Sequence, residues 1–145
     1  MRNLGLGLVL SMLIGACGCS KAGGNPGDIA AIQRAYLTGD YKASLRLAHS
    51  CYELNTGNAT GYEARYWEGM SLLSLNQAAN AQNPLQEAAD SAPDRTIRIL
   101  ALRGLAKAQL AAGDADRAED TWKRLQKQYP KEIDEAEMDR SLAEC

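Results

Sequence analysis

The residues of this 145-residue chain that could form covalent or metal bonds are four cysteines and one histidine. They are Cys17, Cys19, His49, Cys51 and Cys145. The cysteines form no CxxC pair, and neither they nor the histidine show a zinc-ligand spacing. The carboxylates are scattered, and no glycine-rich phosphate loop follows a predicted strand. We therefore expect a protein that is not an enzyme, with no catalytic residue, no metal and no cofactor.

Cys17 follows an apolar leader, residues 1–16. Arg2 is the only charged residue of this leader, and residues 4–14 are mostly apolar. That stretch is too short for a membrane-spanning helix and fits the apolar core of a signal peptide. The leader therefore predicts export, and an oxidising compartment permits disulfides. A bridge between Cys19 and Cys145 has no support from the spacing.

Residues 14–17, with the sequence IGAC, resemble the lipobox of bacterial lipoproteins. The resemblance implies cleavage before Cys17 and acylation of its sulfur and amine, and several acyl chains together anchor a protein stably. Gly18, rather than an aspartate, resembles the pattern for sorting to the outer membrane. Two alternatives stay open: an ordinary cleaved signal peptide, or acylation at Cys19, which matches less well. Residues 17–27 are then the lipidated N-terminus and a flexible tether.

The rest of the chain repeats itself at a spacing of 37 residues. From Gly113-Asp114, one step back reaches Asn76-Gln77, and a second step reaches Gly39-Asp40. Further equivalent positions are Ala118, Ala81 and Ser44, then Trp122, Leu85 and Ala48, then Leu125, Ala88 and Cys51. Small residues let two helices approach closely, and larger ones fill the space beside them, so we expect Cys51 to pack in the core. The clear departures are Thr56, in place of Pro93 and Pro130, and Ile32, in place of Gly69 and Ala106.

Composition and capping residues predict helices throughout this region. Ala and Leu are abundant, Phe is absent and Val occurs only in the leader, which favours helix over strand. The expected N-caps are Asp28, Asp40, Asp94 and Asp114, together with a capping box of Thr60 and Glu63. The expected helices cover about 28–38, 41–55, 60–75, 78–91, 94–112 and 114–129. Pro84 should bend the fourth helix or delay its first turns.

The repeat resembles the tetratricopeptide repeat, in which small residues and an aromatic recur at set intervals before a closing proline. The matching residues of the third copy are Ala106, Ala118, Trp122 and Pro130. The usual period is about 34 residues, and the longer period here and Tyr66-Trp67 resemble periplasmic envelope members of the family. Examples are the Tol–Pal-associated coordinator of cell division and the barrel-assembly lipoprotein. The resemblance covers residues 28–130 and implies an all-α solenoid of three helical hairpins, with the acidic residues 131–145 as a capping helix.

In the tetratricopeptide family the first helix of each hairpin lines a concave groove. Carried across by position, the resemblance places six residues there: Gln33, Tyr36, Tyr66, Met70, Arg103 and Lys107. Aromatic residues, Met and Arg are enriched at binding hot spots. The family's clamp for C-terminal carboxylates is absent, because its Lys and Asn positions are occupied by other residues. Those positions hold Ile29, Gln33, Trp67, Leu100 and Gly104. The chain's own acidic tail, residues 132–144, is a competing occupant of the groove.

After removal of the leader, 15 basic and 18 acidic residues remain, a net charge of −3, which argues against nucleic acid as a partner. The resemblances predict a membrane-anchored adaptor that binds an envelope protein or peptide segment. Its lipid would hold it at the bacterial outer membrane, facing the periplasm. The alternative is a structural scaffold whose repeats self-associate into a homo-oligomer.

Overall fold

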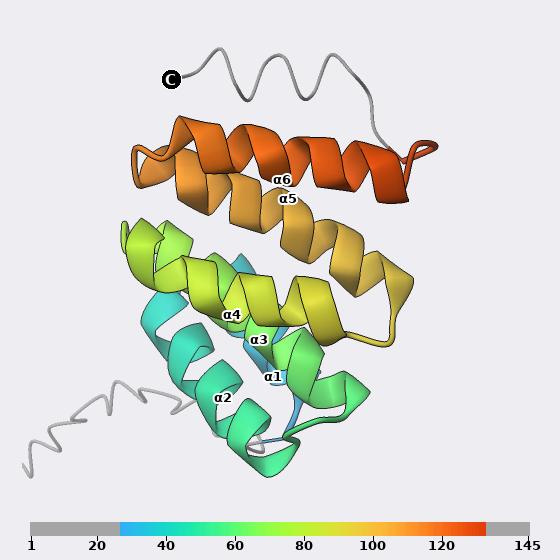
Figure 1. Cartoon of the computed structure of the whole chain (residues 1–145). Coiled ribbons are helices and arrows are strands. Elements are labelled where there is room, and N and C mark those ends of the chain that lie inside the picture. Colours follow the sequence, from blue (N-terminus) through green and yellow to red (C-terminus); the bar gives the residue numbers. More distant parts are fainter. Residues whose placement is uncertain (1–26, 133–145) are drawn as a thin grey trace, which may run out of the picture.

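The computed structural model of the chain describes residues 27–132, and every regular element in this range is an α-helix. The helices are α1 (Ile29–Leu37), α2 (Tyr41–Leu54), α3 (Ala59–Ser74), α4 (Ala78–Ser91), α5 (Arg95–Ala111) and α6 (Ala115–Gln128). Consecutive helices pack as three stacked hairpins, α1–α2, α3–α4 and α5–α6 (Figure 1). The predicted all-α solenoid is therefore confirmed. The predicted leader, Cys17 and the capping helix beyond Glu132 lie outside the described residues.

The helix boundaries repeat at the 37-residue period. The first helices of the hairpins end at Leu37, Ser74 and Ala111, and the second helices cover 41–54, 78–91 and 115–128. The first helices differ at their beginnings. α1 begins at Ile29, the position equivalent to Tyr66 and Arg103, and so lacks the roughly two initial turns of α3 and α5.

The three hairpin turns share one backbone geometry. Gly39, Asn76 and Gly113 are left-handed, with φ of 81°, 58° and 84°. The next residue in each turn donates its N–H to the carbonyl five positions back, at 2.9 Å in all three cases. This is the Schellman motif, which satisfies the last carbonyls of a helix. Glycine adopts the left-handed conformation without steric cost and asparagine tolerates it, which explains the recurring sequence at these turns.

Side-chain caps begin five of the six helices in residues 27–132, four of them as predicted. In those four, Asp28, Asp40, Asp94 and Asp114 accept a hydrogen bond from a backbone N–H of the first turn. The predicted capping box of Thr60 and Glu63 is wrong, because α3 begins one residue before Thr60. Its N-cap is Asn58, whose side chain accepts a hydrogen bond from the Gly61 N–H at 3.0 Å. Asn58 is itself held in place, since its amide donates to Asn55 Oδ1 at 3.3 Å.

The beginning of α4 differs from those of the other second helices. Its N-cap, Gln77, accepts no hydrogen bond from a backbone N–H of the first turn, and its Oε1 accepts instead from the Asn80 side chain at 3.1 Å. Pro84 lies inside the helix and is buried. The helix nevertheless begins at Ala78, the same repeat position at which α2 and α6 begin. Pro84 therefore does not delay the first turns of α4.

Equivalent positions of the second helices form the core between the hairpins. The nine residues Ser44, Ala48, Cys51, Ala81, Leu85, Ala88, Ala118, Trp122 and Leu125 are all fully buried. The prediction that Cys51 packs in the core is confirmed. Cys51 is a free thiol, and its burial raises its pKa.

The departure of Ile32 from the repeat is explained by the small residue at the facing position of the second helix. Ile32 is fully buried in a cluster with Ala48. In the second hairpin the sizes are exchanged, because Gly69 faces Leu85 so closely that an added Cβ would lie 2.4 Å from Leu85 Cγ. A large residue on one helix is thus matched by a small one on the other, which keeps the packing close.

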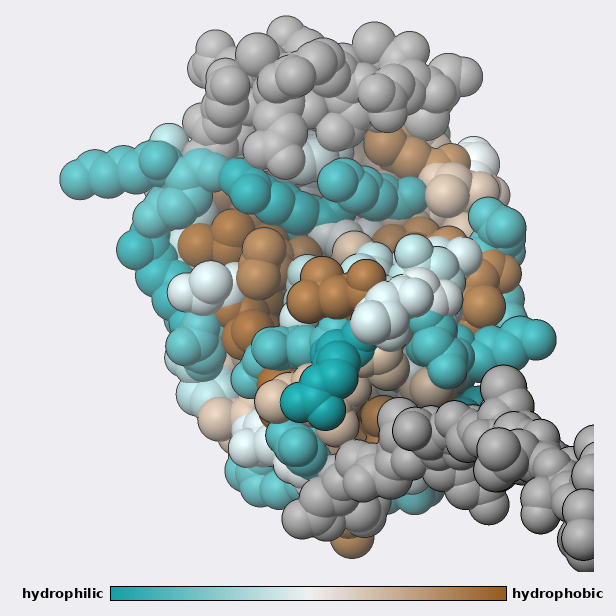
Figure 2. Space-filling view, turned by 180° about the vertical axis from the view of Figure 1, so that it is seen from behind, coloured by the Kyte–Doolittle hydropathy of each residue, from teal (hydrophilic) through white to brown (hydrophobic). Residues whose placement is uncertain are grey.

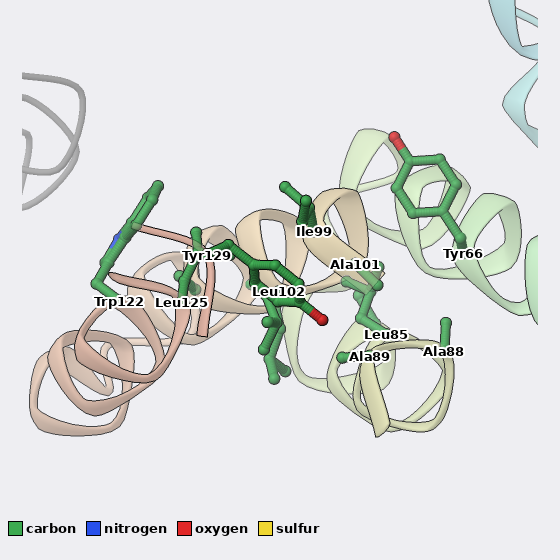
Figure 3. Close-up of a cluster of buried hydrophobic side chains, with 14 of the residues drawn as sticks. Tyr66, Leu85, Ala88, Ala89, Ile99, Ala101, Leu102, Trp122, Leu125 and Tyr129 are labelled. Carbon is green, nitrogen blue, oxygen red and sulfur yellow. The ribbon is translucent and has the colours of Figure 1, made fainter. Parts of the chain in front are cut away.

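Buried hydrophobic side chains form two clusters. The larger joins α3 to α6, and Figure 3 labels among its members Leu85, Leu102, Trp122, Leu125 and Tyr129. The smaller joins α1, α2 and α3 around Ile32. Buried hydrogen bonds also connect neighbouring helices, from Ser71 Oγ to Ser44 Oγ at 2.9 Å and from Thr121 Oγ1 to Gln109 Oε1 at 2.7 Å. These two hydrogen bonds pair four buried polar side chains across helix interfaces.

Candidate peptide-binding face

The first helices of the three hairpins lie side by side. α3 contacts both α1 and α5, whereas α2, α4 and α6 make no comparable contact with one another within residues 27–132. The stack is thus packed more closely along α1, α3 and α5, which form its inner side, called here the first-helix face. Figure 2 shows this face, with hydrophobic side chains across its middle and hydrophilic side chains around them.

Two rows of equivalent positions cross the first-helix face. One is Ile29, Tyr66 and Arg103, and the other is Gln33, Met70 and Lys107. Contacts between neighbouring first helices involve residues of these rows. Gln33 Nε2 donates to Glu63 Oε1 at 3.3 Å, and Met70 Sδ would lie 3.2 Å from a Cβ added to Gly104. The period therefore brings these residues onto one face, and their role as ligand contacts stays a prediction.

An aromatic cluster occupies one end of the first-helix face. It consists of Tyr36, Tyr41, Tyr66 and Trp67. The ring centroids of Tyr36 lie 5.2 Å from those of Tyr41 and 5.3 Å from those of Trp67, and Tyr66 and Trp67 are 5.1 Å apart. Such tilted and edge-to-face pairs stabilise one another beyond their burial. The Tyr36 hydroxyl is also hydrogen-bonded to Ser74 Oγ at 3.1 Å.

Members of the aromatic cluster differ in how much of each side chain is exposed to solvent. Tyr66 is only 9% exposed, and burial raises its pKa. Tyr36 and Trp67 are half-buried. The ring of Tyr66 is therefore used mainly in packing, and Tyr36 and Trp67 are better placed to touch a ligand.

Arg103 and Lys107, predicted as the cationic end of the groove, have different surroundings. Arg103 is half-buried, and its Nη2 donates to the carbonyl oxygen of Glu132 at 2.6 Å. Lys107 is exposed, and its ammonium group makes no hydrogen bond or ion pair within the part of the chain that the structure describes. Of the two cations, Lys107 is the more accessible to a ligand.

Two residues around this face, Tyr41 and Arg95, were not predicted to contribute to it. Arg95 precedes Arg103 by eight residues on the same side of a helix, so helical periodicity could have identified it. Tyr41 reaches the face only through the turn that precedes it, and its spacing carries no such signal.

A charged cluster lies where α2, α3 and α4 meet. Arg65 pairs with Glu68 at 2.8 Å and with Glu87 at 2.6 Å, and its guanidinium lies 4.1 Å from the ring centroid of Tyr52. Burial disfavours the charge on Arg65, but hydrogen bonds to the two glutamates outweigh burial and raise its pKa. The hydrogen bond from Tyr52 to Glu87 raises the pKa of Tyr52. These charges satisfy one another, and the cluster joins the first two hairpins.

The only histidine lies beside this charged cluster. His49 has a side chain that is 57% exposed and lies 3.4 Å from both Glu53 and Glu68. It is an exposed surface residue. Within residues 27–132, no three His, Cys, Asp or Glu side chains are grouped so as to hold a metal ion. In the same range, no helix has the length and apolar character needed to cross a membrane.

Comparison with known families identifies the third hairpin. Residues 100–132 match the tetratricopeptide repeat, a range that contains most of α5 and all of α6. No curated protein and no solved structure matches the chain. The chain therefore carries a tetratricopeptide repeat, and its six helices form a solenoid of that type. Such repeats present extended surfaces that bind other proteins, so the fold defines a protein-interaction module.

Proposed function

We propose that this chain is a membrane-anchored adaptor of the bacterial cell envelope that binds a segment of another envelope protein on its first-helix face. In this proposal acylated Cys17 holds the chain at the outer membrane, and residues 18–27 let the repeats face the periplasm. The lipobox-like sequence at 14–17 supports the anchor. The 37-residue period and Tyr66-Trp67 resemble the periplasmic members of the family, including the division coordinator and the barrel-assembly lipoprotein, which supports the envelope role.

The observation that carries the binding proposal is the composition of the first-helix face. Half-buried Tyr36 and Trp67 form an aromatic end, Met70 adds an adaptable apolar contact, and exposed Lys107 supplies a positive charge. A ligand that complements this order has an apolar segment followed by an acidic one. We expect Tyr36→Ala to weaken binding by about 1–2 kcal/mol, and Lys107→Glu to act mainly on the association rate and its salt dependence.

Site-specific photocrosslinking in native membranes tests the face. A photoreactive residue at Lys107 should capture one discrete partner. The same residue at Lys123 is the matched control, because this exposed lysine lies on α6, a second helix, and pairs with Glu119 at 2.5 Å. The captured protein is then purified and its affinity is measured for wild type, Tyr36→Ala and Lys107→Glu. Equal capture at both positions, or equal affinity for all three folded proteins, would show that the first-helix face is not the binding surface.

The anchor is tested separately by labelling with a fatty acid. Cys17→Ala should leave an unprocessed precursor without label, whereas Cys19→Ala should be labelled normally. Normal labelling of Cys17→Ala together with loss in Cys19→Ala would move the anchor to Cys19.

A second candidate function is self-association through the first hairpin. The exposed large hydrophobic residues of the described chain are Leu37 and Leu54, 80% and 66% exposed, and both belong to α1 and α2 at one end of the stack. Exposed apolar side chains at an uncovered repeat end favour contact with a second copy. Light scattering at several concentrations should show an oligomer that Leu37→Ser with Leu54→Ser dissociates. A monomer at all concentrations would exclude self-association, and the adaptor would then be the one remaining proposal.

A further inference from the structure

A cavity of about 310 Å³ lies beside α5, outside the residues predicted for the groove except at Arg103. It is lined by Arg95, Thr96, Ile99, Leu100, Arg103 and Glu132. We call it the Arg95–Arg103 pocket. Five of these six residues come from the first three turns of α5, with Arg95, Ile99 and Arg103 on one i, i+4, i+8 line and Thr96 and Leu100 on the line beside it. The sixth arrives from the chain beyond α6.

The turn after α6 places Glu132 in the pocket. Tyr129 is buried in the core and lies under Arg95, whose guanidinium carbon is 5.4 Å from the ring centroid. The Glu132 N–H then donates to the Tyr129 carbonyl at 3.1 Å. This turn brings Glu132 back against α5 rather than continuing along α6.

Two arginines hold Glu132 by different groups. Arg103 Nη2 donates to its main-chain carbonyl at 2.6 Å, and Arg95 Nη2 pairs with its side-chain Oε1 at 2.8 Å. Between the arginines the wall of the pocket is apolar, formed by Ile99 and Leu100. The pocket therefore contacts both parts that define an acidic residue within a peptide, the carboxylate and the backbone carbonyl, beside a surface suited to an aliphatic neighbour.

Glu132 fills this pocket incompletely. Its Oε2 is buried and has no hydrogen-bond donor among residues 27–132, although a buried carboxylate oxygen without a partner is costly. The Arg95–Glu132 pair is also partly exposed, at 56% and 33% for the two side chains, and pairs of this kind contribute little to stability. An occupant of the same chemistry can therefore compete with Glu132.

We propose that the Arg95–Arg103 pocket is a recognition site for an acidic residue of a bound peptide, and that Glu132 occupies it in cis until a partner's acidic segment takes its place. The inference rests on the proposed function, since it assigns the acidic part of the ligand to this pocket. It adds to the proposed function that Glu132 of the same chain competes with the ligand for the pocket. Because the competitor is tethered a few residues from the site, its effective concentration is in the millimolar range, and it sets a threshold for partner binding.

The test uses the full processed chain in detergent and a fluorescent peptide with the sequence of residues 129–137, YPKEIDEAE. In the Glu132→Lys protein, the lysine at position 132 is repelled by both arginines and leaves the pocket. Affinity for the peptide should therefore rise about tenfold, as expected when a tethered competitor is removed. Arg95→Glu should abolish binding of this peptide. The Arg95→Glu protein should instead bind a second peptide, in which Lys replaces the glutamate equivalent to Glu132. The matched control is Lys123→Glu, the loss of an exposed cation on α6, which should bind like wild type.

Several results would overturn the proposal. Equal peptide affinity of wild type and folded Glu132→Lys would show that Glu132 is not a competitor. A failure of Arg95→Glu to switch the peptide preference would show that Arg95 does not read the acidic side chain. Equal loss in Lys123→Glu would reduce the effect to general charge attraction. The adaptor proposal fails separately, in the photocrosslinking at Lys107, a residue that does not line this pocket.

Discussion

In the first hairpin a large residue of the first helix, Ile32, and a small residue of the second, Ala48, are both fully buried in the smaller core cluster. In the third hairpin the sizes are exchanged, and Ala106 and Trp122 occupy the same repeat positions in the larger cluster. The turns are nevertheless alike, with left-handed glycine in both. This repeat therefore preserves its backbone and its filled volume more strictly than the residue type at any one position.

The two hairpins also differ in the length of their first helices. α1 begins at the position equivalent to Arg103. It therefore has no counterpart of the α5 residues that line the pocket before Arg103, which include Arg95. The third hairpin therefore carries a charged recognition site, whereas the first contributes Tyr36 and Tyr41 to the aromatic cluster. One repeat unit thus supplies opposite chemistry at the two ends of one face.

The largest effect that tests this comparison is expected for Trp122→Ala. Loss of a fully buried Trp should destabilise the fold by about 3–5 kcal/mol. Ala48→Gly, at the equivalent position of the first hairpin, should cost about 0.5–1 kcal/mol through helix propensity. Urea unfolding followed by circular dichroism measures both. Trp122→Phe is the control, since it keeps much of the volume and removes an indole N–H that has no acceptor within residues 27–132. Similar losses for Trp122→Ala and Ala48→Gly would contradict the exchange of large and small residues between the two hairpins.

A size exchange in the second hairpin should show intermediate effects. Leu85→Ala alone should cost about 2–5 kcal/mol, and Gly69→Ile alone should clash with Leu85 and cost about 1–3 kcal/mol or more. The double variant copies the filling of the first hairpin and should recover at least about 1 kcal/mol relative to the sum. Unfolding free energies of the four proteins form the cycle. Strict additivity would mean that the two positions are not matched in volume.

The turns provide a smaller test. Asp40 and Asp114 cap α2 and α6 with a side-chain hydrogen bond, and Gln77 at the equivalent position does not. Gln77→Asp should therefore stabilise the chain by about 0.5–1 kcal/mol, and Asp114→Ala should destabilise it by about 0.5–2 kcal/mol. Thermal melting of both variants is sufficient. A Gln77→Asp protein that melts at or below the wild-type temperature would show that the turns are not equivalent.

The smallest effect concerns acid and the beginning of α5. The Ile97 N–H holds the pKa of Asp94 below its ordinary value of 3.8. A carboxyl whose pKa is lower in the folded state stabilises the fold above its unfolded pKa, and this contribution is lost as the pH falls through the folded pKa. Asp94→Asn keeps a capping oxygen without the charge, so its stability should fall less than that of wild type between neutral pH and acid. Parallel pH curves for the two proteins would contradict this assignment.

The local features of the fold follow from the sequence. The left-handed residue and the next N-cap stand side by side in the chain, at Gly39-Asp40 and Gly113-Asp114, so the residues that form each turn can be recognised without knowing what packs on it. The helix ends recur every 37 residues because these turn residues recur at that spacing. The cap of α3 was missed because Asn58 and Thr60, two residues apart, can both act as an N-cap. The hydrogen bond to Asn55 that favours Asn58 depends on how the preceding helix ends.

The period also predicted which residues share the first-helix face, because equivalent positions of stacked repeats must align. It did not determine how exposed each one is. Tyr66 is buried against Trp67, and Arg103 is engaged by Glu132, because these contacts depend on ring packing and on the path of the chain after α6. The compensation of Ile32 by Ala48 likewise depends on two helices meeting. Spacing along the chain determines alignment, whereas side-chain volume and contacts between distant residues decide which aligned groups remain available to a ligand.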